Sequence, residues 1–87
     1  MRMIVNQETD YTQVETIRGD QQRTVILKEG NNYRVNPLNP RKTKHHGRRL
    51  MILTIYDFFN NKCGKCKVRF LDTNRIGFVD MEDLTTD

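Results

Sequence analysis

The sequence predicts a mainly β protein, a small barrel of about five strands behind a short N-terminal extension that is helical or irregular. Residues 50–56 and 66–71 are rich in the β-branched, aromatic and aliphatic side chains that strands favour. Turn-forming Asn, Asp and Gly residues separate these segments from each other and from a third one at residues 76–80. A chain of 87 residues is expected to form one domain, with residues 33–87 as the barrel and residues 1–32 as the extension.

Residues 50–56 are apolar on both faces, with Leu50 and Ile52 on one side and Met51 and Leu53 on the other. This pattern predicts a central strand that is covered on both sides. Residues 66–71 alternate more strictly, because Cys66, Val68 and Phe70 point one way while Lys67 and Arg69 point the other. The Asn- and Gly-containing residues 60–64 between the two segments predict a hairpin.

The third strand is expected at residues 76–80, after a reversal at residues 72–75 in which Asn74 takes a positive φ. Gly77 inside this strand indicates a bend, a bulge or a close backbone approach. Residues 81–84 are then expected to form a short turn of helix that places Leu84 on the end of the barrel.

The N-terminal third is the least informative part of the chain. Tyr11, Val14 and Ile17 recur every three residues, which favours a short amphipathic helix. Residues 24–28 fit either a strand paired with residues 33–35 or the last turns of a helix that Gly30 ends. We favour the helix for the region after Asp20.

Residues 36–46, NPLNPRKTKHH, predict one long loop, because two prolines exclude both helix and strand pairing there. The charge of the chain is concentrated around this loop. Residues 34–71 contain ten basic residues and one acidic residue, a net charge of +9, whereas residues 72–87 carry a net charge of −4. Such a separation can build an anion-binding face, or the acidic segment can neutralise the basic one.

Residues 33–84 resemble the SH3-like barrel superfamily, and within it the small KOW-like and Tudor-like domains. The resembling parts are the opening strand at residues 33–35, the long loop, Gly47 before LMILTI, the strand IGFVD, and the helical turn that ends in EDL. The chain is also similar to uncharacterised small proteins of bacteria and phages that have an NPxNPRK segment ahead of a Gly-Arg step. This resemblance implies a fold rather than a function.

The basic segment suggests a protein that binds nucleic acid with little sequence preference, since each cation beside a phosphate releases a counterion. The expected phosphate contacts are Arg41, Lys42, Lys44, Arg48, Arg49, Lys67 and Arg69. The alternative is a protein-interaction module with an aromatic groove. Its stacking or partner-binding residues would be Tyr33, Tyr56, Phe58 and Phe59. A solvated surface without a ligand explains the same charges.

We expect neither a cofactor nor a metal. The alternative is a zinc site formed by the CxxC residues Cys63 and Cys66 together with His45 and His46. Against it, the side chains of adjacent histidines diverge, and Cys66 is in register with the core residues of its strand. Without a nucleophile and an orienting carboxylate near the histidines, we expect a non-enzyme. The absence of a signal peptide or a membrane span, together with two cysteines, predicts a cytoplasmic protein.

Overall fold

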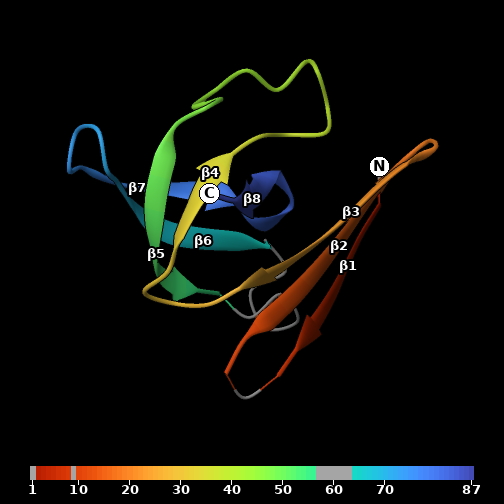
Figure 1. The fold of residues 1–87 in the computed structure, drawn as a ribbon, viewed down its shortest axis with the longest axis horizontal. Helices are drawn as coiled ribbons and strands as arrows, with labels where there is room; N and C mark the ends of the chain where they lie inside the picture. The colour runs from red at the N-terminus through yellow and green to blue at the C-terminus, as the bar shows by residue number, and fades with distance from the viewer. Residues whose placement is uncertain (1, 9, 57–63) are drawn as a thin grey trace.

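The computed structural model describes residues 2–8, 10–56 and 64–87, which form two antiparallel sheets (Figure 1). The elements are β1 (Arg2–Gln7), β2 (Thr12–Arg18), β3 (Gln21–Leu27), β4 (Asn32–Val35), β5 (Arg49–Ile55), β6 (Lys65–Phe70), β7 (Ile76–Asp80), the 3-10 turn η1 (Met81–Asp83) and β8 (Leu84–Thr86). The first sheet has the order β1-β2-β3, and the second has the order β7-β6-β5-β4-β8. The mainly β prediction is therefore confirmed. The described residues form eight strands rather than about five, and the sheets do not close into a barrel.

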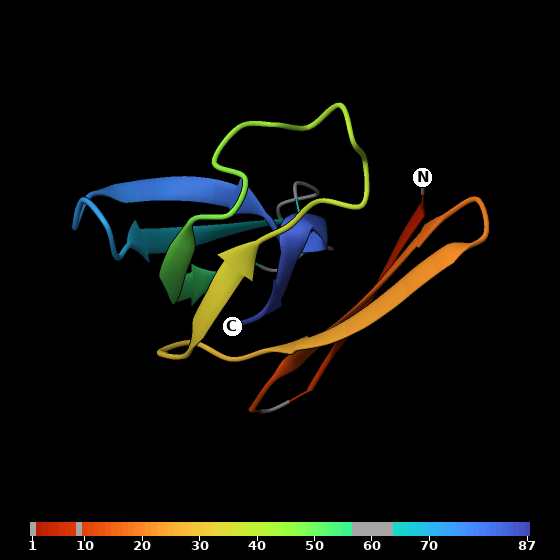
Figure 2. The same ribbon diagram turned by 45° about the horizontal axis from the view of Figure 1, so that its top comes forward.

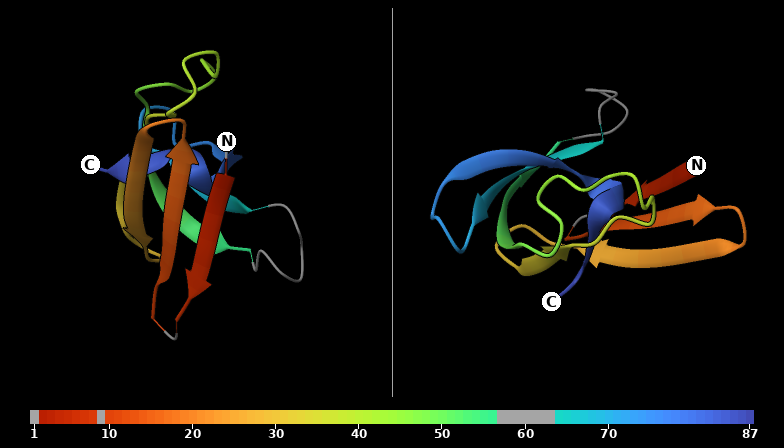
Figure 3. Two further views of the ribbon diagram at one scale, coloured as in Figure 1. Left: turned by 90° about the vertical axis from the view of Figure 1, so that its right-hand side faces the viewer. Right: turned by 90° about the horizontal axis from the view of Figure 1, so that it is seen from above.

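The helix expected around Tyr11, Val14 and Ile17 is wrong, because this segment is the strand β2. Thr12, Val14 and Thr16 are buried, so the burial has a period of two and not of three. The β-branched side chains favour the strand, and Gly19 at a φ of 58° completes the tight turn into β3. What sequence reasoning treated as an extension is a three-stranded sheet, whose strands lie side by side in Figure 3.

The helix favoured after Asp20 is also wrong. Val25 and Leu27 are buried while Thr24 and Ile26 are exposed, which is again the alternation of a strand. β3 pairs with β2 and not with residues 33–35, which belong to β4 and pair with β5 and β8. Gly30, at a φ of 88°, lies in the turn that carries the chain from one sheet to the other.

The second sheet contains the three strands expected from the sequence, each within one residue of its predicted start and end. β5 lies between β6 and β4, with Leu50 and Ile52 completely buried and Met51 and Leu53 partly buried. The hairpin turn after β6 has Asn74 at a φ of 60°, as predicted. The connection between β5 and β6 includes residues 57–63, which lie outside the described part of the chain.

Gly77 marks a close approach in β7. A Cβ atom at this position would lie 2.8 Å from Cε2 of Phe70 on the neighbouring strand, so a larger residue would require the Phe70 ring to shift. The predicted helical turn is present as η1, but it ends at Asp83, and Leu84 is buried as the first residue of the strand β8 rather than on the end of a barrel. β8 returns to pair with β4.

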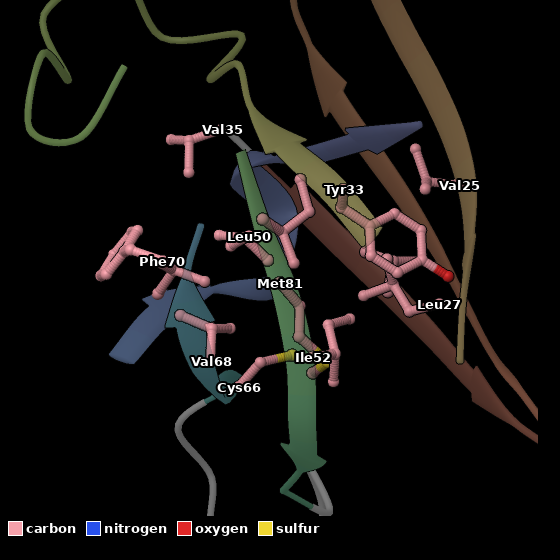
Figure 4. Packing of buried hydrophobic residues seen from close by; sticks show 13 residues of the cluster. Val25, Leu27, Tyr33, Val35, Leu50, Ile52, Cys66, Val68, Phe70 and Met81 are labelled. Carbon is pink, nitrogen blue, oxygen red and sulfur yellow. The ribbon is translucent and has the colours of Figure 1, made fainter. Parts of the chain in front are cut away.

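One core joins the two sheets. Val14, Val25 and Leu27 of the first sheet share a cluster with residues of the second, among them Leu50 and Ile52 (Figure 4). A larger group completes the cluster: Tyr33, Val35, Cys66, Val68, Phe70, Val79, Met81 and Leu84. Residues 1–32 therefore contribute to the same hydrophobic core as residues 33–87.

Two polar side chains hold the junction between the sheets. The Tyr33 hydroxyl donates to the Ile26 carbonyl oxygen (3.0 Å) and accepts from the Lys28 N–H (2.8 Å). Arg23 of β3 donates to the Asn36 and Glu82 carbonyl oxygens. The first sheet is thus fixed to β4, to the start of the long loop and to η1, and it extends beyond the second sheet (Figure 2). In the described part of the chain, no helix has the length and apolarity needed to span a membrane.

Candidate nucleic-acid interface

The long loop that links β4 to β5 carries most of the predicted phosphate contacts, and it contains no strand. Its start is tied to η1, because the Asn36 N–H donates to the Asp83 carbonyl oxygen, and its end is tied to β4, because the Gly47 N–H donates to the Val35 carbonyl oxygen. In Figure 2 the loop arches over the side of the sheet on which β7 and η1 lie. This arrangement places the basic loop beside an edge strand.

Lys42 anchors the loop to the acidic C-terminal segment. Its ammonium group lies 2.8 Å from Asp80, 3.2 Å from Glu82 and 2.7 Å from Asp83. Burial lowers the pKa of Lys42, but the hydrogen bonds to the carboxylates outweigh burial and hold this pKa above its usual value. Burial raises the pKa of Asp83, since one lysine shared by three carboxylates does not offset its loss of solvent. The structure places Lys42 in a carboxylate cluster, where its charge is already compensated.

Arg48 is also compensated. Its guanidinium donates to both carboxylate oxygens of Asp72, at 3.0 and 2.9 Å, and lies 4.0 Å from the centre of the Phe70 ring. The hydrogen bond from Arg48 lowers the pKa of Asp72. His45 contacts both residues, with its ring centre 4.6 Å from that of Phe70 and its Nδ1 2.8 Å from the Arg48 guanidinium. Burial and the neighbouring cations Arg48 and Lys44 lower the pKa of His45.

Arg49 is the first residue of the central strand β5, and it forms an ion pair with Asp87, which follows the edge strand β8. Asp87 also contacts Arg34 of β4, at 3.4 Å. The hydrogen bond from Arg49 lowers the pKa of Asp87. The acidic C-terminal segment thus compensates Lys42, Arg48 and Arg49.

Lys67 and Arg69 project from the solvent-facing side of β6, as the alternation predicted. Lys67 lies opposite Phe78 in the β6–β7 ladder, and Arg69 lies opposite Ile76. Arg69 donates to Asn74, while its Nε atom is buried without a hydrogen-bond partner. Among the described residues, four of the seven predicted phosphate contacts have no carboxylate partner: Arg41, Lys44, Lys67 and Arg69.

A groove of about 580 Å³ runs between the long loop and β7, and we call it the β7 groove. It is lined by Lys44, His45, Arg48, Lys65, Phe70, Thr73, Arg75, Ile76, Gly77 and Phe78. No carboxylate is among these described lining residues, although four lysine or arginine side chains are. Lys44, His45, Lys65 and Phe78 also line a second hollow of about 320 Å³, whose lining includes Arg41, Lys42, Asp80 and Asp83. The β7 groove is therefore an electropositive surface with aromatic side chains in it.

Sequence reasoning missed Lys65, Arg75, Ile76 and Phe78 as site residues. Phe78 is 54% exposed, and its ring stacks on that of Tyr56, with the ring centres 6.1 Å apart and the planes 26° from parallel. Strand alternation could have found it, because a buried Val79 requires Phe78 to face outward.

The predicted aromatic groove is only partly assembled. Tyr33 is a core residue at 3% exposure, with its hydroxyl bonded to β3, so its ring is not available to a partner. Tyr56 lies beside Phe78. Phe58 and Phe59 lie outside the described residues.

In the described part of the chain, the residues of the alternative zinc site do not lie together. Cys66 is fully buried in the core on β6, His45 packs on Phe70, and His46 lies 3.3 Å from the Asn36 side chain. No group of three or more His, Cys, Asp or Glu side chains in the described residues could hold a metal ion. Cys63 lies outside these residues.

Comparisons with known proteins leave the function to be argued from the chain itself. No protein-family model, no curated protein and no solved structure matches it. The charges and contacts around the β7 groove are therefore the basis for the function.

Proposed function

We propose that this protein is a small, non-catalytic, cytoplasmic SH3-like protein that binds nucleic acid with little sequence preference. The observation that carries the proposal is the β7 groove, which brings Lys44, Lys65 and Arg75 together without a carboxylate among its described lining residues. Cations that line a groove attract a phosphate backbone, and each phosphate they neutralise releases condensed counterions.

The distribution of charge supports the groove over the rest of the basic segment. Lys42, Arg48 and Arg49 already have carboxylate partners, and a phosphate would have to compete with them. Lys44 and Arg75 have no carboxylate partner among the described residues, and the only one for Lys65 is Asp80, at 3.6 Å. The cations most available to a phosphate therefore lie along β7.

The SH3-like assignment is supported by the order of elements. A first strand, β4, is followed by a long loop, then by β5, β6 and β7, a 3-10 turn, and a last strand, β8, that pairs with β4. The three-stranded sheet at residues 2–27 is an addition to this pattern. Since such small folds have many functions, the order of strands supports the fold and leaves the function to the groove.

Charge reversal in the groove tests the proposal. For a Lys44→Glu, Arg75→Glu variant, we expect the affinity for short single- and double-stranded nucleic acid to fall at least tenfold at low salt. The slope of log affinity against log salt should shrink by about 1.4 for single strands and about 1.8 for duplexes, since two phosphate contacts are lost. The matched control is Arg18→Glu in the other sheet, which should change neither quantity. Unchanged affinity in the double variant would refute the proposal.

The alternative is a protein-interaction module centred on β7. The observation that favours it is the exposure of two apolar side chains on this edge strand, Ile76 at 49% and Phe78 at 54%. Salt distinguishes the two functions, because an apolar interface weakens little when salt is added whereas phosphate contacts weaken steeply.

A further inference from the structure

The outer edge of β7 has unpaired backbone groups. The Phe70 N–H donates to the Arg75 carbonyl oxygen, and the Met81 N–H donates to the Gly64 carbonyl oxygen. In an antiparallel ladder, residue pairs that exchange backbone hydrogen bonds alternate with pairs that do not. Because the β6–β7 ladder has no register shift, these two bonds identify which of its pairs are hydrogen-bonded. Gly77 and Val79 are thus bonded to β6, whereas the N–H and carbonyl groups of Ile76 and Phe78 point away from it.

No described strand takes up these groups, because β7 is the edge of its sheet. Ile76 and Phe78 also line the β7 groove, together with Lys44 and His45 of the long loop. The strand that lines this electropositive groove therefore also carries a row of unpaired backbone donors and acceptors.

An exposed aromatic ring stands at the same place. The side chain of Phe78 lines both the β7 groove and the second hollow, and Tyr56 supports it by stacking. Lys67 lies directly opposite Phe78 on β6. The edge of β7 thus combines an aromatic surface, unpaired backbone groups and nearby cations.

Resting on the proposed function, we propose that the edge of β7 selects single-stranded over double-stranded nucleic acid. One base stacks on the Phe78 ring, and its unpaired edge exchanges hydrogen bonds with the backbone groups of Ile76 or Phe78. Lys44, Lys65 and Arg75 contact the adjoining phosphates. A duplex cannot bind in this way, since its bases are stacked and already paired with each other.

Backbone hydrogen bonding to any base also explains why little sequence preference is expected. Every base has an aromatic face and at least one donor or acceptor on its edge. The same strand edge could accept an extended acidic peptide as an added strand. We favour the nucleic acid, because a stacked, half-exposed ring beside phosphate-binding cations suits a base better than a peptide.

Three probes test this inference with the full chain: a mixed single strand of about 12 nucleotides, the corresponding duplex, and a glutamate-rich peptide. By fluorescence anisotropy we expect the single strand to bind at least tenfold more tightly than the duplex, and the peptide more weakly than either. Phe78→Ala should reduce single-strand affinity by about 5- to 150-fold, the range for loss of one stacked base, without changing the salt slope. The control is Ile26→Ala, which removes a similarly exposed apolar side chain from the other sheet.

A second pair of variants tests the backbone contact. Ile76→Pro removes an N–H that points away from β6, so the ladder should survive, whereas Ile76→Ala keeps that N–H. We expect single-strand binding to be weaker in the proline variant than in the alanine variant, with circular dichroism showing both folded. If Ile76→Pro does not fold, the Phe78→Ala result decides.

The possible outcomes separate this inference from the proposed function. Equal binding of single strand and duplex, with no effect of Phe78→Ala, overturns the inference and leaves the groove as a phosphate site. Tight binding of the peptide alone overturns both in favour of strand addition. No binding of any probe overturns both.

Discussion

The Nζ atom of Lys42 lies 2.7 Å from the Oδ2 atom of Asp83, and this contact fastens the long loop to η1. Asp83 is buried, and its other oxygen has no hydrogen-bond partner. Lys42→Met should therefore leave a buried carboxylate without its cation and lower the free energy of unfolding by about 1–3 kcal/mol in urea titrations.

The matched control is Lys44→Met, which removes a lysine that has no carboxylate partner among the described residues and should change stability by less than about 0.5 kcal/mol. Nucleic-acid affinity should instead fall more for Lys44→Met than for Lys42→Met. If Lys42→Met reduced the salt slope as much as Lys44→Met, Lys42 would be a phosphate contact after all.

Asp80 and Asp83 should make stability depend on pH with opposite signs. Burial raises the pKa of Asp80, but the hydrogen bond from Lys42 outweighs it and holds this pKa below the ordinary value of 3.8. The unfolded chain then binds the proton first, so the stability that Asp80 contributes is complete above that value and is lost as the pH falls further. Burial raises the pKa of Asp83 instead, so its contribution is lost as the pH rises above 3.8.

Urea titrations of Asp80→Asn and Asp83→Asn across this range check the two signs. Relative to the parent chain, the Asp80 variant should lose less stability on acidification below pH 3.8. The Asp83 variant should lose less as the pH rises above 3.8. If the stability of both variants followed the same pH dependence as that of the parent chain, these carboxylates would have equal pKa values in the folded and unfolded chain.

Tyr33→Phe should weaken the attachment between the two sheets. The change removes the hydroxyl that bonds both the Ile26 carbonyl and the Lys28 N–H, and the free energy of unfolding should fall by about 1–3 kcal/mol. The comparison is Tyr56→Phe, since the Tyr56 hydroxyl has no hydrogen-bond partner among the described residues. Equal stability of both variants in urea would mean that the Tyr33 hydroxyl does not hold the sheets together.

Gly77→Ala should distort the β7 groove and destabilise the chain. The new methyl group would lie 2.8 Å from Cε2 of Phe70, which His45 and Arg48 hold in place, and the cost should be about 1–3 kcal/mol. Combining it with Phe70→Leu makes room for the methyl group. A double-mutant cycle should then show a favourable coupling of about 0.5–3 kcal/mol, and strict additivity would contradict the contact.

Strands β5, β6 and β7 of the second sheet could be predicted from the sequence because each shows its burial locally, whereas β8 was missed. Cys66, Val68 and Phe70 alternate with charged residues, and Asn74 marks the following turn. The first sheet could not be predicted, because Tyr11, Val14 and Ile17 have a spacing that suits a helix and also occur in a segment that can form a strand. What decides for the strand is pairing with β1 and β3, a contact between segments that no single window reveals.

The basic residues of the candidate site could be predicted from the sequence, but the contacts that they make in the fold could not. The basic residues of the loop are evident in the sequence, yet the compensation of Lys42 by Asp83 joins residues that are far apart in the chain. Phe78 was missed because its exposure follows from the pleat of β7 against β6 rather than from residue type.

An amide NMR titration with a mixed single strand, at low salt and again at higher salt, tests the nucleic-acid function most directly. We predict shifts that cluster on residues 41–48, 65–69 and 75–78 and that fade as salt is added. Residues 2–27 of the first sheet serve as the internal reference and should stay unchanged. A spectrum that does not move, or shifts confined to the first sheet, would contradict the account and direct the search to protein partners.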